Sequence, residues 1–200
     1  MAMGRGAILC VTVVCMLIGT AMAAPSDRKN VLSFSEGALV LSATNRHEAK
    51  WDPLYLIDGN IQTGWRSAEG KPKKNEIIIE LAQLSRIEEI VLDSTGDEEK
   101  DSPGCSVRAF EVWGSKTSSQ KRFSRILSAK ATRAMRNVYK LPQSTTCRWV
   151  KLVVKDNWGS KSYTQVMELA AYGKPLGRVP KPYPIEGIYG TNLGALRLKQ

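Results

Sequence analysis

With 200 residues, of which 42% are hydrophobic and 24% charged, the chain has a globular composition that excludes an intrinsically disordered polypeptide. The length suits one domain with a tail, and the formal net charge of +10 at pH 7 favours anionic partners. After residue 23, no apolar run approaches the roughly 18 residues that a membrane-spanning helix needs.

The first 23 residues have the pattern of a secretory signal. Arg5 supplies a positive charge, an apolar run follows, and this run ends in Ala21-Met22-Ala23, which matches a small-residue cleavage motif. The sequence therefore predicts cleavage after Ala23 and a secreted or periplasmic protein, with a membrane anchor as the alternative. Residues 24–32 are then expected to form a flexible leader.

Residues 33–173 read as short β-segments separated by polar, turn-rich connections. The period of two is clearest towards the end, where Val150, Leu152 and Val154 are predicted to point inward. About eight short strands and no long amphipathic helix favour an all-β sandwich or barrel. The expected strands are residues 38–43, 75–81, 86–94, 107–115, 122–127, 136–141, 148–155 and 165–173.

The composition changes after this β-rich region. Residues 174–184, "KPLGRVPKPYP", are rich in proline and are predicted to form a semi-rigid linker. Residues 185–200 begin to alternate again, either as a surface strand or, as we expect, as the start of a second β unit.

Four cysteines are present, but Cys10 and Cys15 lie in the predicted signal. Cys105 and Cys147 would remain in an oxidising compartment, where two cysteines allow one pairing, so the sequence predicts a disulfide. Closing a loop of about 40 residues would contribute roughly 3–4 kcal/mol in the chain-entropy model. Two separate thiols are the alternative.

Charges are unevenly distributed along the chain. Between Glu76 and Glu111 acidic residues dominate, whereas between Val112 and Lys155 there are basic residues and no acidic one. This segregation predicts a molecule with one basic side, which would attract an anionic glycan or a membrane surface rather than nucleic acid. A solvated face that only keeps the protein soluble is the alternative.

Five stretches occur in an order that resembles the discoidin family, also called the coagulation factor 5/8 C-terminal-like domain, which overlaps one group of carbohydrate-binding modules. They are "SATNRHEAKWDPLYLIDGNIQTGWRS", "NEIIIELAQLSRIEEIVL", "FEVWGS", "RWVKLVV" and "VMELAAYG". The resemblance covers about residues 33–173. It implies an eight-stranded antiparallel jelly-roll β-sandwich of the galactose-binding-like type, secretion, ligand binding by loops at one end, and no catalysis.

The resemblance also implies a structural calcium ion near "DGNIQT". Calcium prefers six to eight hard oxygen ligands, and Asp58 offers a carboxylate beside a glycine that permits a tight turn. The family's distant acidic ligand corresponds to Glu168. The predicted calcium ligands are Tyr55, Asp58, Asn60, Thr63 and Glu168. A plain turn at Asp58-Gly59 with a surface acid at Glu168 is the alternative.

Two tryptophans, Trp51 and Trp158, stand in polar loops where the strand pattern does not demand burial, whereas Trp65 is predicted to lie in the core. Sugar rings stack on flat aromatic faces, and charged or amide groups bind their hydroxyls. The predicted ligand-binding residues are therefore His47, Trp51, Arg66, Asn157, Trp158 and Lys161. Aromatic residues that only anchor the loops are the alternative.

The sequence thus predicts a secreted non-catalytic module that binds glycan or cell-envelope polysaccharide through loops of a calcium-stabilised sandwich. An enzyme is not expected, because a serine–histidine–acid triad would have to use the only histidine, His47, and no nucleophile motif accompanies it. The alternatives are an adhesion or structural module that binds a protein or an anionic membrane surface, or an accessory domain of a larger enzyme.

Overall fold

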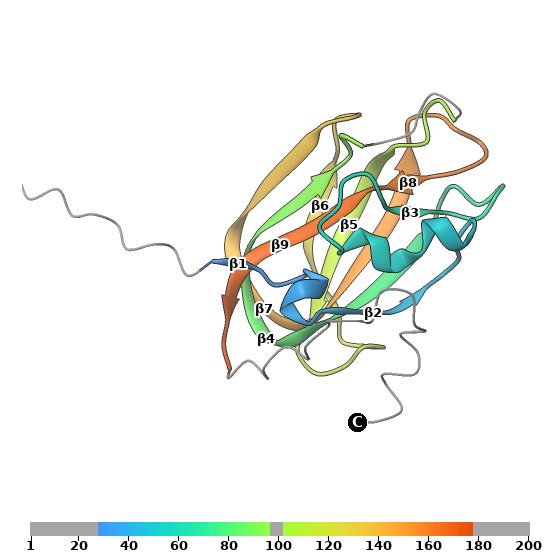
Figure 1. Cartoon of the computed structure of the whole chain (residues 1–200). Helices are drawn as coiled ribbons and strands as arrows, with labels where there is room; N and C mark the ends of the chain where they lie inside the picture. Colours follow the sequence, from blue (N-terminus) through green and yellow to red (C-terminus); the bar gives the residue numbers. More distant parts are fainter. Residues whose placement is uncertain (1–27, 97–101, 178–200) are drawn as a thin grey trace, which may run out of the picture.

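The computed structural model describes residues 28–96 and 102–177 (Figure 1). The strands are β1 (Lys29–Asn30), β2 (Leu39–Ala43), β3 (Trp65–Arg66), β4 (Asn75–Asp93), β5 (Val107–Ser115), β6 (Ser124–Lys130), β7 (Arg136–Asn157), β8 (Gln165–Val166) and β9 (Glu168–Pro175). Three short 3-10 helices are η1 (Phe34–Glu36), η2 (Ala49–Trp51) and η3 (Pro53–Leu56). The predicted all-β class is confirmed.

The main sheet is antiparallel, with the strand order β1-β9-β4-β7-β5-β6 and with β2 added beside β4, while β3 and β8 pair separately. β4 changes partners along its length. Residues 75–80 pair with β2 and the second half of β7, whereas residues 85–93 pair with β9 and the first half of β7. This exchange, with a register break between Glu80 and Ser85, makes the sheet curve around a common interior (Figure 1).

The strand boundaries differ from the expected ones. The segments 75–81 and 86–94 are parts of one strand, β4, and 136–141 and 148–155 are parts of β7. Each of these long strands passes from one layer to the other through a bend, and no turn separates its two halves. β6 spans residues 124–130 instead of 122–127.

The period-two pattern correctly identifies the buried side of the sheet. Ile77, Ile79 and Leu81 of β4 are at most 1% exposed, and Val150 and Leu152 of β7 are fully buried. Burying one large aliphatic side chain contributes about 1.5–3 kcal/mol, so this alternation drives the packing of the two layers.

Trp65 is fully buried, as predicted, and its indole Nε1 donates to the Asn45 carbonyl at 2.8 Å. The prediction of a flexible leader is wrong for residues 28–32. β1 pairs with β9, and Val31 and Leu32 are buried in the core. Two apolar residues are too few to predict a strand from the sequence. They are buried because the preceding residues pair with β9 at the edge of the sheet.

The predicted disulfide is wrong, because Cys105 and Cys147 are both buried and no disulfide joins them. Cys105 precedes β5, whereas Cys147 lies within β7, and the two strands are antiparallel: β5 begins opposite Asn157 and ends opposite Trp149. The cysteines therefore lie near opposite ends of β5, on the order of 25–30 Å apart at about 3.3 Å per residue. A disulfide requires Cα atoms within about 7 Å.

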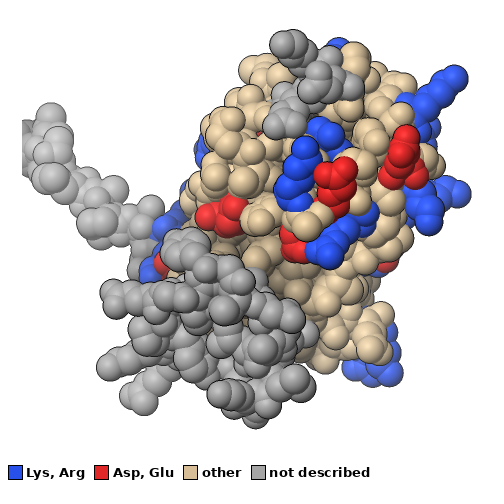
Figure 2. All heavy atoms as spheres, turned by 45° about the vertical axis from the view of Figure 1, so that its right-hand side comes forward, with Lys and Arg blue, Asp and Glu red and all other residues tan. Residues whose placement is uncertain are grey.

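Acidic and basic side chains are interspersed on the sheet, so the predicted basic side is not formed by the strands. Antiparallel pairing places the acids of β4 and β5 beside the bases of β6 and β7. Figure 2 shows red carboxylates beside blue basic groups on the face it displays. The ion pairs include Lys151–Glu76 at 3.3 Å, Arg148–Glu80 at 3.1 Å, Arg125–Glu111 at 3.3 Å and Arg136–Asp93 at 3.8 Å.

The predicted signal at residues 1–23 and the predicted second β unit at 185–200 lie outside the described residues. Of the predicted linker, Lys174 and Pro175 belong to β9, and residues 178–184 also lie outside. Within residues 28–96 and 102–177, no helix is long and apolar enough to cross a membrane.

Candidate functional site

Three connecting segments meet at one end of the sandwich, which we call the loop end: residues 44–64, 67–74 and 158–164. Backbone hydrogen bonds join them. The His47 amide donates to the Arg66 carbonyl at 2.9 Å, and the Gly70 amide donates to the Ser162 carbonyl at 2.9 Å. The short β3–β8 pair sets the spacing of the last two segments.

Arg66 is the centre of an aromatic cluster at the loop end. Its guanidinium carbon lies 3.9 Å from the Trp51 ring centroid and 5.5 Å from that of Tyr163. Its Nε donates to Gln165 Oε1 at 3.0 Å. The side chain is buried, with Arg66 only 7% exposed, and contacts with ring faces and an amide oxygen offset the cost of desolvating its charge.

His47 and Tyr163 form the more accessible part of this cluster. Their ring centroids are 4.6 Å apart, and His47 Nε2 lies 3.4 Å from Glu48 Oε1. Tyr163 is not among the residues predicted from the sequence, although it lies in the same polar loop as Trp158. His47 and Arg66 are brought together as expected.

Trp51 is brought into the cluster but is only 3% exposed, so its ring is closed to a stacking sugar. Its proximity to Arg66 makes it a support for the guanidinium. The indole Nε1 of Trp51 is buried without a hydrogen-bond partner among the described residues. Burying an unmatched N–H costs free energy, so this donor favours a bound acceptor such as water or a ligand oxygen.

Asn157 is buried and holds the 158–164 loop together from within. Its Nδ2 donates to the carbonyl oxygens of Ser160 and Tyr163 at 2.9 and 2.7 Å, and its Oδ1 accepts from the Gly159 amide at 3.0 Å. These bonds occupy the amide, so Asn157 shapes the loop instead of facing a ligand.

Trp158 and Lys161 are exposed on the same loop. Trp158 is 41% exposed, and the Arg108 guanidinium lies 5.9 Å from its ring centroid. An exposed tryptophan in an internally bonded loop is a preorganised platform for a flat apolar surface.

The "DGNIQT" loop satisfies much of its own hydrogen bonding. The Asn60 amide donates to Asp58 Oδ1 at 2.9 Å, and Thr63 Oγ1 donates to Asp58 Oδ2 at 2.7 Å. Gly59 has a φ of +82°, which explains the need for glycine in this turn. Tyr55 lies in η3, where its amide donates to the Asp52 carbonyl at 3.0 Å.

Glu168, at the start of β9, is the unusual group beside this loop. It is 7% exposed, and its Oε2 has no hydrogen-bond partner among the described residues. The pKa of Glu168 is raised to about 8, chiefly by burial and also by the negative charges of Asp58 and Asp93. The hydrogen bond from the Gly59 amide lowers this pKa and offsets part of the rise. A buried carboxylate oxygen without a donor, in the electrostatic field of Asp58 and Asp93, suits a cation.

Carboxylates alone do not complete a metal site here. In the part of the chain that the structure describes, no group of three or more His, Cys, Asp and Glu side chains is placed to hold a metal. The charge on Asp58 and the unmatched oxygen of Glu168 fit calcium if backbone carbonyl and hydroxyl oxygens of the loop supply the remaining ligands.

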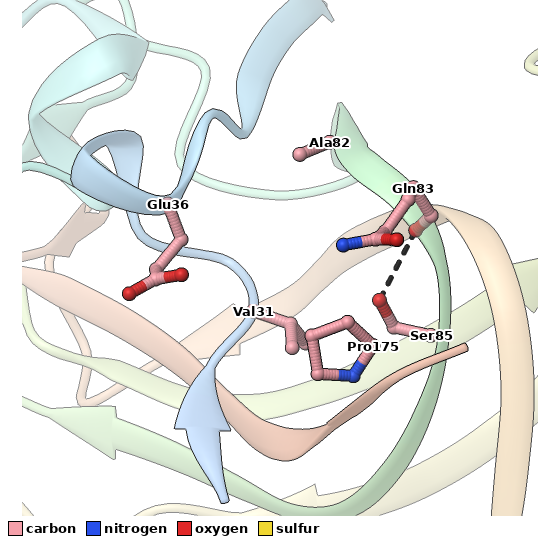
Figure 3. Close-up of a pocket in the computed structure, with 6 residues that line it drawn as sticks. All are labelled: Val31, Glu36, Ala82, Gln83, Ser85 and Pro175. Atoms are coloured by element: carbon pink, nitrogen blue, oxygen red, sulfur yellow. Dashed lines mark hydrogen bonds between the residues drawn. The ribbon is translucent and has the colours of Figure 1, made fainter. Parts of the chain in front are cut away.

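A small hollow lies elsewhere, at the bend of β4. Its walls are Val31, Glu36, Ala82, Gln83, Ser85 and Pro175 (Figure 3). Its volume of about 10 Å³ leaves room for about one water molecule. The buried Gln83 Oε1, which has no partner among the described residues, would accept a hydrogen bond from that water. The hollow is too small for a sugar ring.

The fold and the loop end define an antiparallel galactose-binding-like β-sandwich with a polar and aromatic cluster on its loops. The model of the F5/8 type C domain family matches residues 40–169, which is most of the chain. The protein belongs to this family. No curated protein matches the chain.

Solved structures of the same fold include several carbohydrate-binding modules. The family 32 module of Clostridium perfringens NanJ, in complex with galactose, is 14% identical with a TM-score of 0.58, and the match covers 72% of this chain and 98% of that one. The C-terminal domain of a chitobiase from Bacteroides fragilis is 23% identical with a TM-score of 0.60, covering 76% and 100%.

A third similar structure is a GH29 fucosidase from Ruminococcus gnavus in complex with fucose. It is 19% identical with a TM-score of 0.59, and the match covers 74% of this chain but 27% of the fucosidase. The same fold therefore occurs within a much longer enzyme chain.

Proposed function

We propose that the protein is a secreted, non-catalytic module that binds glycan at the loop end. The observation that carries this proposal is the convergence of His47, Arg66 and Tyr163 from three separate segments, beside the loop that exposes Trp158. Imidazole, guanidinium and phenol groups form hydrogen bonds with sugar hydroxyls, and an indole face packs against the apolar side of a sugar ring. Similar folds solved with galactose and with GalNAc-β-1,3-galactose support the choice of ligand class.

The proposed contacts are His47, Arg66, Tyr163, Trp158 and Lys161. Trp51 and Asn157 have positioning roles, because the first packs on Arg66 and the second fixes the 158–164 loop. The buried indole N–H of Trp51 could also donate to a ligand oxygen that enters the cluster. Secretion rests on the sequence of residues 1–23 alone.

A non-catalytic role is supported by the environment of the single histidine. His47 packs against Tyr163 and lies beside Glu48, and neither residue is a nucleophile of the serine or cysteine type. The family membership supports the same conclusion. A longer protein in which this module accompanies a catalytic domain is compatible with the proposal.

Calcium would stabilise the loop end in this proposal. The carboxylates of Asp58 and Glu168 would hold the ion, together with oxygens of Tyr55, Asn60 and Thr63. The ion would supply the positive charge that the unmatched Glu168 oxygen requires, and it would fasten the start of β9 to the loop before β3. It has no role in any reaction here.

The test is a glycan array with the purified protein in calcium, followed by calorimetry on each positive glycan. We expect Tyr163→Ala and Trp158→Ala to weaken binding at least tenfold, because each removes a contact surface. Met135→Ala, which changes a side chain that is 53% exposed in the turn after β6, is the matched control and should bind normally. A folded protein that binds no glycan would refute the proposed function.

A further inference from the structure

Two of the loop-end segments, residues 67–74 and 158–164, form one continuous surface, which we call the two-loop ridge. The Ser67 amide donates to the Thr164 carbonyl at 2.9 Å, and the Thr164 amide donates to Ser67 Oγ at 2.9 Å. The Gly70 amide bonds to the Ser162 carbonyl. Side chains on both loops are thus held in fixed relation to each other.

The two-loop ridge is strongly basic. It carries four lysines against a single acid, Glu69, which gives a formal charge of +3. All four lysines are exposed: Lys71, Lys73, Lys74 and Lys161. Lys73 lies 3.5 Å from Asp156, while Lys71, Lys74 and Lys161 have no ion pair among the described residues.

Basic residues on the sheet face are in a different situation. Lys151, Arg148 and Arg125 each lie within 3.3 Å of a glutamate. Ion pairing cancels their field at a distance, whereas unpaired lysines on the ridge attract anions. The uncompensated charge therefore lies beside the proposed sugar contacts and next to the exposed Trp158.

We propose that the glycan bound at the loop end is an acidic polysaccharide. Its carboxylate or sulfate groups would contact Lys71, Lys74 and Lys161, while a sugar ring packs against Trp158. Lysine binds such groups as a flexible point charge, which suits anions that recur along a chain at variable spacing. This inference rests on the proposed glycan-binding function and specifies its substrate class.

Binding of hyaluronan and heparin oligosaccharides to the full protein tests the proposal, with carboxyl-reduced hyaluronan and desulfated, re-N-acetylated, carboxyl-reduced heparin as neutralised counterparts. We expect each acidic ligand to bind at least tenfold more tightly than its counterpart at 50 mM NaCl. This difference should shrink at 300 mM NaCl, because salt screens exposed charges beyond several ångströms. The two ligand pairs also show whether carboxylate or sulfate is preferred.

Charge-matched variants locate the interaction. Lys71→Gln/Lys74→Gln should weaken binding of the acidic ligand about tenfold, whereas Lys121→Gln/Arg122→Gln, in the β5–β6 turn at the opposite end of β5, should change it less than twofold. Equal losses in both variants would overturn the proposal, because they would indicate attraction to the net charge. Equal binding of acidic and neutralised glycans would overturn it while leaving the proposed function intact. No binding to any glycan would refute both.

Discussion

Asn157 shows how one buried amide determines the shape of a binding loop. Its Nδ2 and Oδ1 atoms bond to four groups between Gly159 and Thr164. Asn157→Ala removes the partner of three backbone groups and of the Thr164 hydroxyl, so we expect a loss of about 1–3 kcal/mol in denaturant unfolding. Asn157→Asp keeps the acceptor but loses both donors and should recover little. A loss below about 0.5 kcal/mol for the alanine variant would contradict this role.

Asp58 allows a test of calcium that changes the turn by one side-chain atom. Calcium should raise the melting temperature by several degrees, because a ligand at 100 times its Kd stabilises the folded state by about 2.7 kcal/mol. Asp58→Asn removes the charge and keeps one of the two side-chain oxygens that accept hydrogen bonds in the turn, and it should abolish most of the rise. Trp158→Ala should retain it. Identical melting curves in calcium and in chelator, at matched ionic strength, would show that the loop is a simple turn.

Glu168 predicts the pH dependence of the metal-free protein. Burial, then the charges of Asp58 and Asp93, raise its pKa from 4.5 to about 8 in the folded state. The folded form therefore holds a proton that the unfolded form releases above about pH 4.5. This contribution to stability is complete below that pH and is lost as the pH rises through about 8.

In chelator, the unfolding free energy should therefore fall between about pH 5 and pH 8, by at most about 1.4 kcal/mol per pH unit from this group. Glu168→Gln is neutral at every pH and should flatten the curve over this range. Denaturant titrations of the two proteins at several pH values measure the difference. Parallel curves would mean that Glu168 is ionised in the metal-free fold.

Residue-level roles were only partly predictable from the sequence. The polar segments around His47, Arg66 and Trp158 do meet at the loop end, because alternation and turn residues show where strands stop, while the part of these residues in binding stays a prediction. They did not reveal that Trp51 and Asn157 turn inward, since the orientation of a loop side chain depends on contacts distant in sequence. Tyr163 was missed for the same reason.

At the scale of the secondary-structure element, the antiparallel direction of β5 and β7 keeps the two cysteines apart. In the protein without residues 1–23, Cys105 and Cys147 should react with a thiol reagent only after unfolding. Both are buried, and burial raises the pKa of Cys147 to about 12, which suppresses the reactive thiolate. Reductant should leave the melting temperature unchanged. An intact mass two hydrogens below that of the dithiol form would contradict the structure.

The elements themselves were more predictable than their connections. Alternating residues identified the buried faces of β4 and β7, since the side-chain period of a strand is a local property. The local pattern could not show that each strand continues through the bend and serves both layers. The disulfide error has the same origin, because sequence order does not reveal which ends of antiparallel strands meet.

At the scale of the whole molecule, charge illustrates the difference between sequence and structure. Acids and bases are separated along the chain, yet antiparallel pairing intersperses them on the sheet. The positive charge of the two-loop ridge remains uncompensated, because the ridge lies beyond the strands whose pairing brings acidic and basic side chains together. Charge-based expectations about a β-protein therefore depend on its register.

The location of glycan binding is tested most directly by the five tryptophan indole N–H signals in an ¹⁵N-correlated spectrum during glycan titration. The chain contains five tryptophans, which differ in location. Trp51 and Trp158 lie at the loop end, whereas Trp113 of β5 and Trp149 of β7 are half-buried, alternate with buried residues and so lie on the outer face of the sheet. We predict that binding shifts the signals of Trp51 and Trp158 and leaves those of Trp113 and Trp149 in place. Shifts confined to Trp113 and Trp149, or none with a glycan that binds, would contradict a binding site at the loop end.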